Sequence, residues 1–457
     1  MTENQNMTKG KPLKLLFFFA LPLMFGNIFQ QLYTVVDTAI VGNGVGMEAL
    51  AALGTVDWLN WMLLGIAQGF TQGFSVRISQ KYGEGDQEGV KKAIGTSARL
   101  SAVIALICMA LSQLFLPLFL QFLRVPVELR GMAELYTRIL FGGLGAVVFY
   151  NFCSSVLRAV GDSKTPLKAM IAASVTNIVL DLLAVFVLKW GIAGAAAATV
   201  LSQCLSGFLC ALKIWKTPGL HFGKEHVETD RELEKTLIKI GTPVAAQNII
   251  ISVGGMAVQM IVNGFGMSFI AGFTATNKLY GILEIAAISY GYAVTTYVGQ
   301  NYGALERGRI KSGIRAALVL SVATSALIAV IMIVFGRTIT MLFISSEDPE
   351  LAAAAGNTAY LYLCIMSVLL PVLYLLYVYR SALQGMGNTM TAMVSGIIEF
   401  VLRVGVAFLI GMTGYETGIL CAEAAAWFGA AVFLMAAYYI NIGKIMKGEG
   451  GEDAVQR

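Results

Sequence analysis

Charged residues are scarce in this chain. Only 13% of its 457 residues are Asp, Glu, Lys or Arg, whereas soluble globular proteins contain about 25%. Apolar residues make up 57% of the sequence, and the mean hydropathy is +0.73. So few charges cannot cover the surface of a water-soluble protein of this length. The composition therefore predicts an integral membrane protein.

Histidines and clustered cysteines are also scarce. The two histidines, His221 and His226, lie in a polar stretch, where we expect them to be solvated. The six cysteines lack metal-ligand spacing and are interpreted as small core residues. No HExxH, GxSxG or P-loop motif occurs, which argues against a membrane-embedded enzyme and against ATP as the direct energy source within this chain. The sequence thus predicts neither an enzyme nor a cofactor.

The apolar runs are long enough to cross a membrane. A membrane-spanning helix needs about 20 apolar residues, and scanning on that basis predicts an all-α protein with twelve transmembrane helices. The expected spans lie near 14–41, 50–75, 97–120, 134–156, 168–189, 192–214, 236–263, 269–297, 314–337, 357–381, 391–411 and 417–440.

Lys and Arg are distributed unevenly between these spans. The termini and even-numbered connections, including Arg380 in the tenth, hold roughly 25 of them against about 5 in the odd-numbered connections. This bias predicts a multi-pass protein of the cytoplasmic (inner) membrane with both termini in the cytoplasm. It also explains the net charge of +5 without nucleic-acid binding.

The two halves of the chain resemble each other. Gln80, Tyr82 and Gly83 recur 220 residues later as Gln300, Tyr302 and Gly303, and NGVGM at 43–47 recurs as NGFGM at 263–267. Each half holds six spans and begins on the same side. We therefore expect two lobes related by a pseudo-two-fold axis along the membrane normal, on either side of a central cleft.

The repeat also predicts the domain limits. These are an N-terminal lobe at 1–214, a cytoplasmic linker at 215–235, a C-terminal lobe at 236–445 and a polar tail at 446–457.

Particular residues carry a family resemblance. The first span has the pattern P-x₇-Q-Q-L-Y-x₃-D ending in VGN, from Pro22 through Asp37 to Asn43, and KYGEGD and NYGAL follow spans two and eight. With Asn177 and Asp181 in span five, these motifs resemble the multidrug and toxin extrusion (MATE) family, within the polysaccharide and lipid exporter superfamily.

This resemblance covers nearly the whole chain and implies function as well as fold. It implies two six-helix lobes with a V-shaped cleft and export of organic cations in exchange for sodium or protons. It also implies a cation site in the N-terminal lobe, which matches Asp37, Asn177 and Asp181, and less closely Thr199. Pro22 matches a proline near which the first helix bends in some members.

The polar residues of the first span share one side of a helix. At about 100° per residue, Asn27, Gln30, Gln31, Thr34, Asp37 and Thr38 fall within roughly 120°. A carboxylate at the bilayer centre costs roughly 2.5–3.5 kcal/mol even on insertion scales. This stripe must therefore face protein or water, because hydrocarbon cannot satisfy it.

Span five places Asn177 and Asp181 one turn apart on one face. Together with Asp37 they offer hard oxygen ligands for sodium. They could equally share a proton, because two close carboxylates resist carrying two charges. A purely structural polar network between helices is the remaining interpretation.

The second half has a stripe without an acid, on span seven. From this asymmetry we expect the ion chemistry to be confined to the first lobe, and we expect Glu399 and Arg403 to form a structural ion pair. Met and aromatic side chains suit varied organic cations. The candidate substrate-binding residues are Asn27, Gln30, Gln31, Tyr33, Thr34, Tyr150, Met256, Gln259, Met260, Asn263, Tyr280 and Glu284.

These observations predict a sodium- or proton-coupled antiporter for small organic cations, surrounded by membrane lipid and monomeric by default. A flippase for lipid-linked or other anionic lipid substrates is the alternative. It should have several cations inside its spans to hold phosphate, but only Lys278 and Arg403 lie well inside. A channel is disfavoured by the duplicated lobes.

Overall fold

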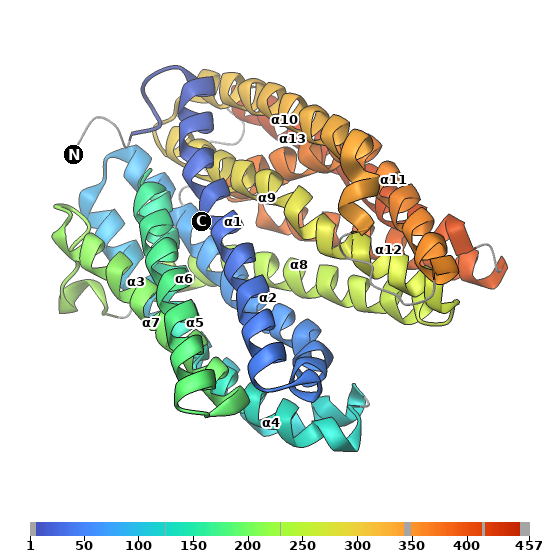
Figure 1. The fold of residues 1–457 in the computed structure, drawn as a ribbon. Coiled ribbons are helices and arrows are strands. Elements are labelled where there is room, and N and C mark those ends of the chain that lie inside the picture. The colour runs from blue at the N-terminus through green and yellow to red at the C-terminus, as the bar shows by residue number, and fades with distance from the viewer. Residues whose placement is uncertain (1–5, 124, 229, 342–348, 414–415, 448–457) are drawn as a thin grey trace. The chain divides into compact units, whose positions relative to one another are not determined.

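The structure is a computed structural model that describes residues 6–123, 125–228, 230–341, 349–413 and 416–447, and these residues form helices and their connections without any strand (Figure 1). Nine of the described helices are long and apolar enough to cross a membrane, and two bent helix pairs raise this number to eleven. The 37-residue α9 (Met267–Gly303), which carries Lys278 and Glu284, completes the predicted twelve spans.

The first six spans follow the predicted order. They are α1 (Pro12–Gly44), α2 (Met47–Glu84), α3 (Gln87–Phe122), the pair α4 (Val127–Gly142) and α5 (Leu144–Ala159), α6 (Lys164–Leu182) with the π-helical turn η2 (Leu183–Val187), and α7 (Gly191–Lys216). Many exceed the predicted bounds. A helix of 36 residues such as α3 is about 54 Å long at 1.5 Å per residue, so its hydrogen bonding continues well beyond its apolar part.

The second six spans repeat this arrangement. A short 3₁₀ turn, η3 (Lys224–His226), precedes α8 (Arg231–Val262), and then follow α9, α10 (Arg307–Met341), α11 (Pro349–Gly385), α12 (Thr389–Thr413) and a 3₁₀ turn η4 (Glu416–Cys421) that leads into α13 (Ala422–Lys447). Helices α9, α10 and α11 pack against one another.

The predicted span 134–156 is a bent pair rather than one straight helix. Helices α4 and α5 meet at Gly143 with a bend of 43°. A Cβ atom at this position would lie 2.2 Å from a methyl carbon of Val200 on α7. Glycine therefore allows the bend to approach α7 closely.

The described residues form two compact units. Unit 1 consists mainly of Leu21–Ala245, and unit 2 of Met7–Ala20 together with Ala246–Arg457. Helices α1 and α8 each begin in one unit and continue in the other, and the change falls beside Pro22 and Pro243. A proline lacks the N–H group that would complete the helix there. The division of the repeats at 215–235 and the axis and cleft between the lobes stay predictions.

The segment before α1 is anchored within unit 2. Met7 is buried, and its carbonyl accepts hydrogen bonds from Asn301 Nδ2 at 3.1 Å and from Arg309 Nη2 at 3.2 Å. Arg309 Nη2 also donates to the carbonyl of Gly10 at 3.1 Å. The residues that anchor this segment follow the repeated Gln300–Gly303 motif or belong to it.

The segment before α8 is anchored in the same way within unit 1. His226 is buried; its Nε2 lies 3.0 Å from Glu88 Oε1, and its Nδ1 accepts from the backbone N–H of Gly223 at 3.0 Å. The expectation that His226 is solvated is therefore wrong, because the polar stretch folds back onto α3. His221 is exposed, as expected.

Candidate functional site

Two helices of unit 1 bring the predicted coupling residues together. Asp37 lies on α1, and Asn177 and Asp181 lie one turn apart on α6; all three are buried, with exposed fractions of 8%, 1% and 0%. The carboxyl groups of Asp37 and Asp181 lie close enough to act on each other electrostatically. The structure thus places an acid of the first span beside an acid of the fifth.

Tyr33 extends this cluster toward α7. Its phenol group lies close to Asp37, Asp181 and Gln203. A cavity of about 10 Å³ separates these helices and is lined by Tyr33, Met170, Ala173, Ser174, Asn177, Thr199, Ser202 and Gln203. A space of this size holds at most one water molecule or small ion.

Five polar atoms of the cluster have no hydrogen-bond partner among the described residues. They are Asp37 Oδ1, Asn177 Oδ1 and Nδ2, and both carboxylate oxygens of Asp181. Nearly all buried polar side-chain atoms in proteins are paired, and burying one unpaired costs roughly 1–3 kcal/mol. So many unpaired acceptors beside a small cavity fit a site that takes up a proton, a monovalent cation or water.

The donor set suits a proton or a small hard cation such as sodium. Four of the five unpaired atoms are carboxylate or amide oxygens, which are hard ligands. No group of three or more His, Cys, Asp or Glu side chains that could hold a metal ion occurs among the described residues. Thr199 donates its hydroxyl to the carbonyl of Ala195 at 3.1 Å, which leaves its oxygen free to accept beside the cavity.

Other residues of the first-span stripe have different surroundings. The Thr34 and Thr38 hydroxyls are exposed and donate to the carbonyls one turn earlier, Gln30 and Thr34. Asn27, Gln30 and Gln31 are half-buried. Tyr150 packs in an apolar core of unit 1 that includes Ile78 and Phe152.

Unit 2 contains a second acid site, whose acid, Glu284, is half-buried. Glu284 on α9 accepts hydrogen bonds from the phenol of Tyr280 at 3.0 Å and from the phenol of Tyr377 on α11. The ring of Tyr280 stacks on Trp427, with centroids 5.7 Å apart. The structure therefore places two phenols on one candidate acid, with Trp427 stacked on one of them, and the sequence identified only Tyr280 and Glu284.

An ion network lies next to this site. Arg403 on α12 is 2.8 Å from Glu423 on α13 and 3.8 Å from Glu399, and Glu399 also pairs with Arg380 on α11. The predicted contact between Glu399 and Arg403 is confirmed, but each residue has a closer partner on another helix. Adding Glu284, the cluster holds three acids and two arginines.

Sequence reasoning missed two members of this network. Arg380 was assigned to the tenth connection, yet it lies inside α11 and is buried. Glu423 received no role. Lys278, expected inside a span, is exposed. These partners lie 19 and 20 residues apart on different helices, so the periodicity of a single helix cannot pair them.

The polar stripe of span seven lies on α8. Gln259 Nε2 donates to Asn263 Oδ1 at 2.8 Å, so these two amides partly satisfy each other. Met256 is half-buried, whereas Met260 is exposed. The acids of the described α8, Glu232 and Glu234, lie in its first turn and are not part of this stripe, which agrees with the sequence prediction.

The chain is built of two successive copies of one helical pattern and carries buried acids inside its membrane spans, which defines a class of membrane transporter. A family model described as MatE matches residues 22–183 and again residues 243–409, so the two matches begin at Pro22 and Pro243. The chain belongs to the MatE family, whose members are transporters and not enzymes.

Several known proteins are similar to this chain. The "Probable multidrug resistance protein YpnP" of Bacillus subtilis is 31% identical over 399 residues, which cover 87% of this chain and 88% of the relative. The "Multidrug export protein MepA" of Staphylococcus haemolyticus is 23% identical over 90% of each chain. A solved structure described as MATE in the bent conformation superimposes with a TM-score of 0.89 at 21% identity and covers 98% of this chain and 99% of its own.

Proposed function

We propose that the protein is a cation-coupled antiporter that exports small cationic, amphiphilic compounds across the cytoplasmic membrane, with both termini in the cytoplasm and one chain as the working unit. The observation that carries this proposal is the pair of buried acids, Asp37 and Asp181, whose oxygens lack partners beside Asn177. The names of YpnP and MepA support a drug-export role.

The acid pair provides the coupling. When Asp37 and Asp181 both carry charge, their repulsion favours uptake of a sodium ion or a proton between α1 and α6. Uptake removes that repulsion and lets the two helices pack more closely. The coupling ion therefore biases a two-state packing of α1, and the export substrate prefers the other state.

Pro22 is the proposed point at which α1 responds. The helix is continuous through Pro22, yet it passes from one compact unit to the other there. The missing backbone hydrogen bond weakens resistance to bending at this residue. The Asp37 side chain lies 15 residues further along the same helix, so a change in its packing is transmitted along a rigid element.

The aromatic acid site of unit 2 is the proposed contact for the cationic substrate. Tyr280 and Tyr377 bind Glu284 through their hydroxyls, and the ring of Tyr280 stacks on Trp427, so the acid lies in an aromatic environment, which attracts cations by about 0.5–2 kcal/mol. The surrounding network has one acid more than it has arginines, so it favours a positive guest.

A flippase for anionic lipids is not favoured by this network. Both interior arginines, Arg380 and Arg403, are engaged by carboxylates and are not available to a phosphate. An anionic headgroup would meet excess negative charge.

Transport in proteoliposomes tests the proposal. The native protein, Asp37→Asn and Asp181→Asn are purified and reconstituted separately into proteoliposomes. The proteoliposomes are loaded with a fluorescent organic cation, and a sodium gradient or a pH gradient is imposed. We expect each substitution to lower gradient-driven efflux about tenfold or more, because each removes a charge that the coupled state requires. The gradient that drives efflux identifies the coupling ion.

A matched control separates charge loss from a general effect. Glu48 is an exposed acid in the first turn of α2, and Glu48→Gln should leave efflux unchanged. Undiminished efflux in both Asp37→Asn and Asp181→Asn would remove the acid pair from the mechanism. Efflux driven equally well without any ion gradient would refute coupled antiport.

A further inference from the structure

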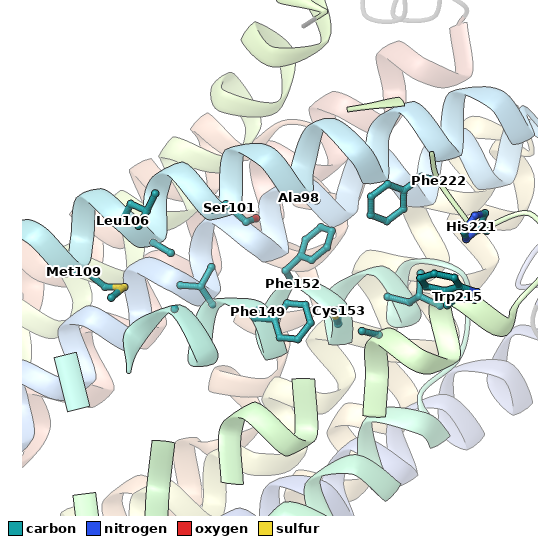
Figure 2. A pocket seen from close by; sticks show the side chains of 16 residues that line it. Ala98, Ser101, Leu106, Met109, Phe149, Phe152, Cys153, Trp215, His221 and Phe222 are labelled. Atoms are coloured by element: carbon teal, nitrogen blue, oxygen red, sulfur yellow. The ribbon is translucent and has the colours of Figure 1, made fainter. Parts of the chain in front are cut away.

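Unit 1 has a groove that shares no residue with the small cavity beside the acid pair. It has a volume of about 590 Å³ and runs between α3, α5 and α7. Figure 2 shows Leu106 and Met109 at one end, Phe149 and Phe152 in the middle, and Trp215 at the other end. Its wall is almost entirely apolar and contains no acidic residue, so a cationic guest finds no counter-charge there.

The groove has the depth of one membrane leaflet. Its wall on α3 runs from Ala98 to Met109, which is about 16 Å of helix at 1.5 Å per residue. Half of a hydrocarbon core of about 30 Å is about 15 Å. An extended acyl chain that crosses one leaflet matches this length.

One end of the groove has the features of a membrane–water interface. Trp215 is largely exposed, and its ring lies 5.2 Å from the ring of His221. Helix α7 ends at Lys216, and Lys213 and Lys216 lie in its last turn. Tryptophan is enriched at the level of lipid headgroups, so the Met109 end points toward the bilayer centre.

The groove is continuous with a lipid-facing surface. Val103, Leu106, Ile107 and Leu114 on α3 are all exposed apolar side chains. A membrane-spanning flank of this kind is covered by acyl chains wherever protein does not cover it. The groove thus opens into the hydrocarbon that surrounds the unit.

Besides Cys153, Trp215 and His221, the wall carries one hydroxyl group, that of Ser101, which marks the glycerol level. Ser101 is 4% exposed, and its hydroxyl has no hydrogen-bond partner among the described residues. It lies one turn deeper than Ala98 on α3, between Ala98 and Leu106 (Figure 2). A buried hydroxyl without a partner is costly, and an ester carbonyl would supply the acceptor.

We propose that this groove is a binding site for a membrane phospholipid. One acyl chain lies along α3, α5 and α7, its ester carbonyl accepts from Ser101, and its headgroup lies beside Trp215 and His221. The bound lipid fills a gap between three helices and so stabilises unit 1.

Lipid retention measured by native mass spectrometry tests the site. Ala102 is a groove residue, and Val103 is an exposed neighbour on the same helix that does not line the groove. After delipidation in detergent, we expect the native chain and Val103→Phe to retain one added phosphatidylcholine per chain. In Ala102→Phe the affinity should fall about tenfold or more, since displacing even two methylenes from an apolar site has this effect. Equal retention in both variants would overturn the proposal.

A second measurement does not depend on a filled groove. Phosphatidylcholine brominated near its ester group is titrated into delipidated native protein, and tryptophan fluorescence is compared with that of Trp215→Phe. The part of the signal due to Trp215 should be quenched and should saturate at one lipid per chain. Quenching without saturation, displacement of the lipid by the exported organic cation, or a dimer that forms in place of the lipid complex would each refute the assignment.

Discussion

Loss of Glu423 should destabilise unit 2 strongly, because it leaves Arg403 without its closest partner. The two side chains are 2.8 Å apart, and Arg403 is only 4% exposed. Glu399 cannot compensate, since it is 3.8 Å away and already pairs with Arg380. Removing one member of a buried pair costs about 3–5 kcal/mol.

The expected loss can be converted into a melting shift. For a unit of 150–250 residues, 1 kcal/mol corresponds to about 2–4 °C, so Glu423→Leu should lower the unfolding temperature by about 6–20 °C. The assay is thermal unfolding of the full chain in detergent, followed by tryptophan fluorescence. Glu232→Gln in an exposed ion pair with Lys235 is the control, and it should change stability by about 0–1 kcal/mol.

A double substitution distinguishes the buried charge from lost packing. Arg403→Met combined with Glu423→Leu removes both charges and keeps similar volume, and buried pairs replaced in this way are often neutral or stabilising. We therefore expect the double variant to be more stable than Glu423→Leu alone. Strict additivity of the two single effects would show that the ion pair does not carry the stability.

Three further outcomes follow from local geometry. Gly69→Ala should destabilise unit 1, because a Cβ atom there would lie 2.4 Å from the Cα of Ala245 on α8. A Cβ atom at Gly54 on the same helix α2 would have no neighbour within 4 Å, so Gly54→Ala should be tolerated. Thermal unfolding of the two variants tests this difference. Asp86 caps α3 by accepting a hydrogen bond from the N–H of Gly89 at 2.8 Å, and this bond lowers the pKa of the Asp86 carboxyl group. The cap therefore stabilises the folded chain above the unfolded pKa of about 3.9. This stabilisation is lost as the pH falls through the lower pKa of the folded state. Asp86→Ala should remove about 0.5–2 kcal/mol and this part of the acid dependence, while Asp86→Ser should keep the cap. Arg309→Ala should speed amide hydrogen exchange in residues 7–10, and the exposed Lys311→Ala should not.

The buried acids of the first and fifth spans were visible in the sequence for a physical reason. A polar residue in a membrane span must be satisfied internally, so the stripe containing Asp37 and the one-turn spacing of Asn177 and Asp181 were visible from helical periodicity alone. The sequence also showed the repeat, which the two MatE matches confirm.

The partners in unit 2 were not visible in the same way. The charge pattern predicts Arg380 in a connection, because positive charge normally lies outside spans, but α11 continues past it to Gly385. His226 was read as solvated because its neighbours are polar, yet the chain folds it against Glu88. Both depend on contacts between distant segments.

The sequence by itself determined that this chain crosses the membrane about twelve times and that acids lie inside its first and fifth spans, because the hydrocarbon environment constrains every helix separately. The repeated motifs also determined that the chain is a duplication. Three features were decided only by the tertiary structure: the pairing of charges across helices, the change of α1 and α8 from one unit to the other beside their prolines, and the groove between α3, α5 and α7. Each of them depends on packing between segments that are far apart in the chain.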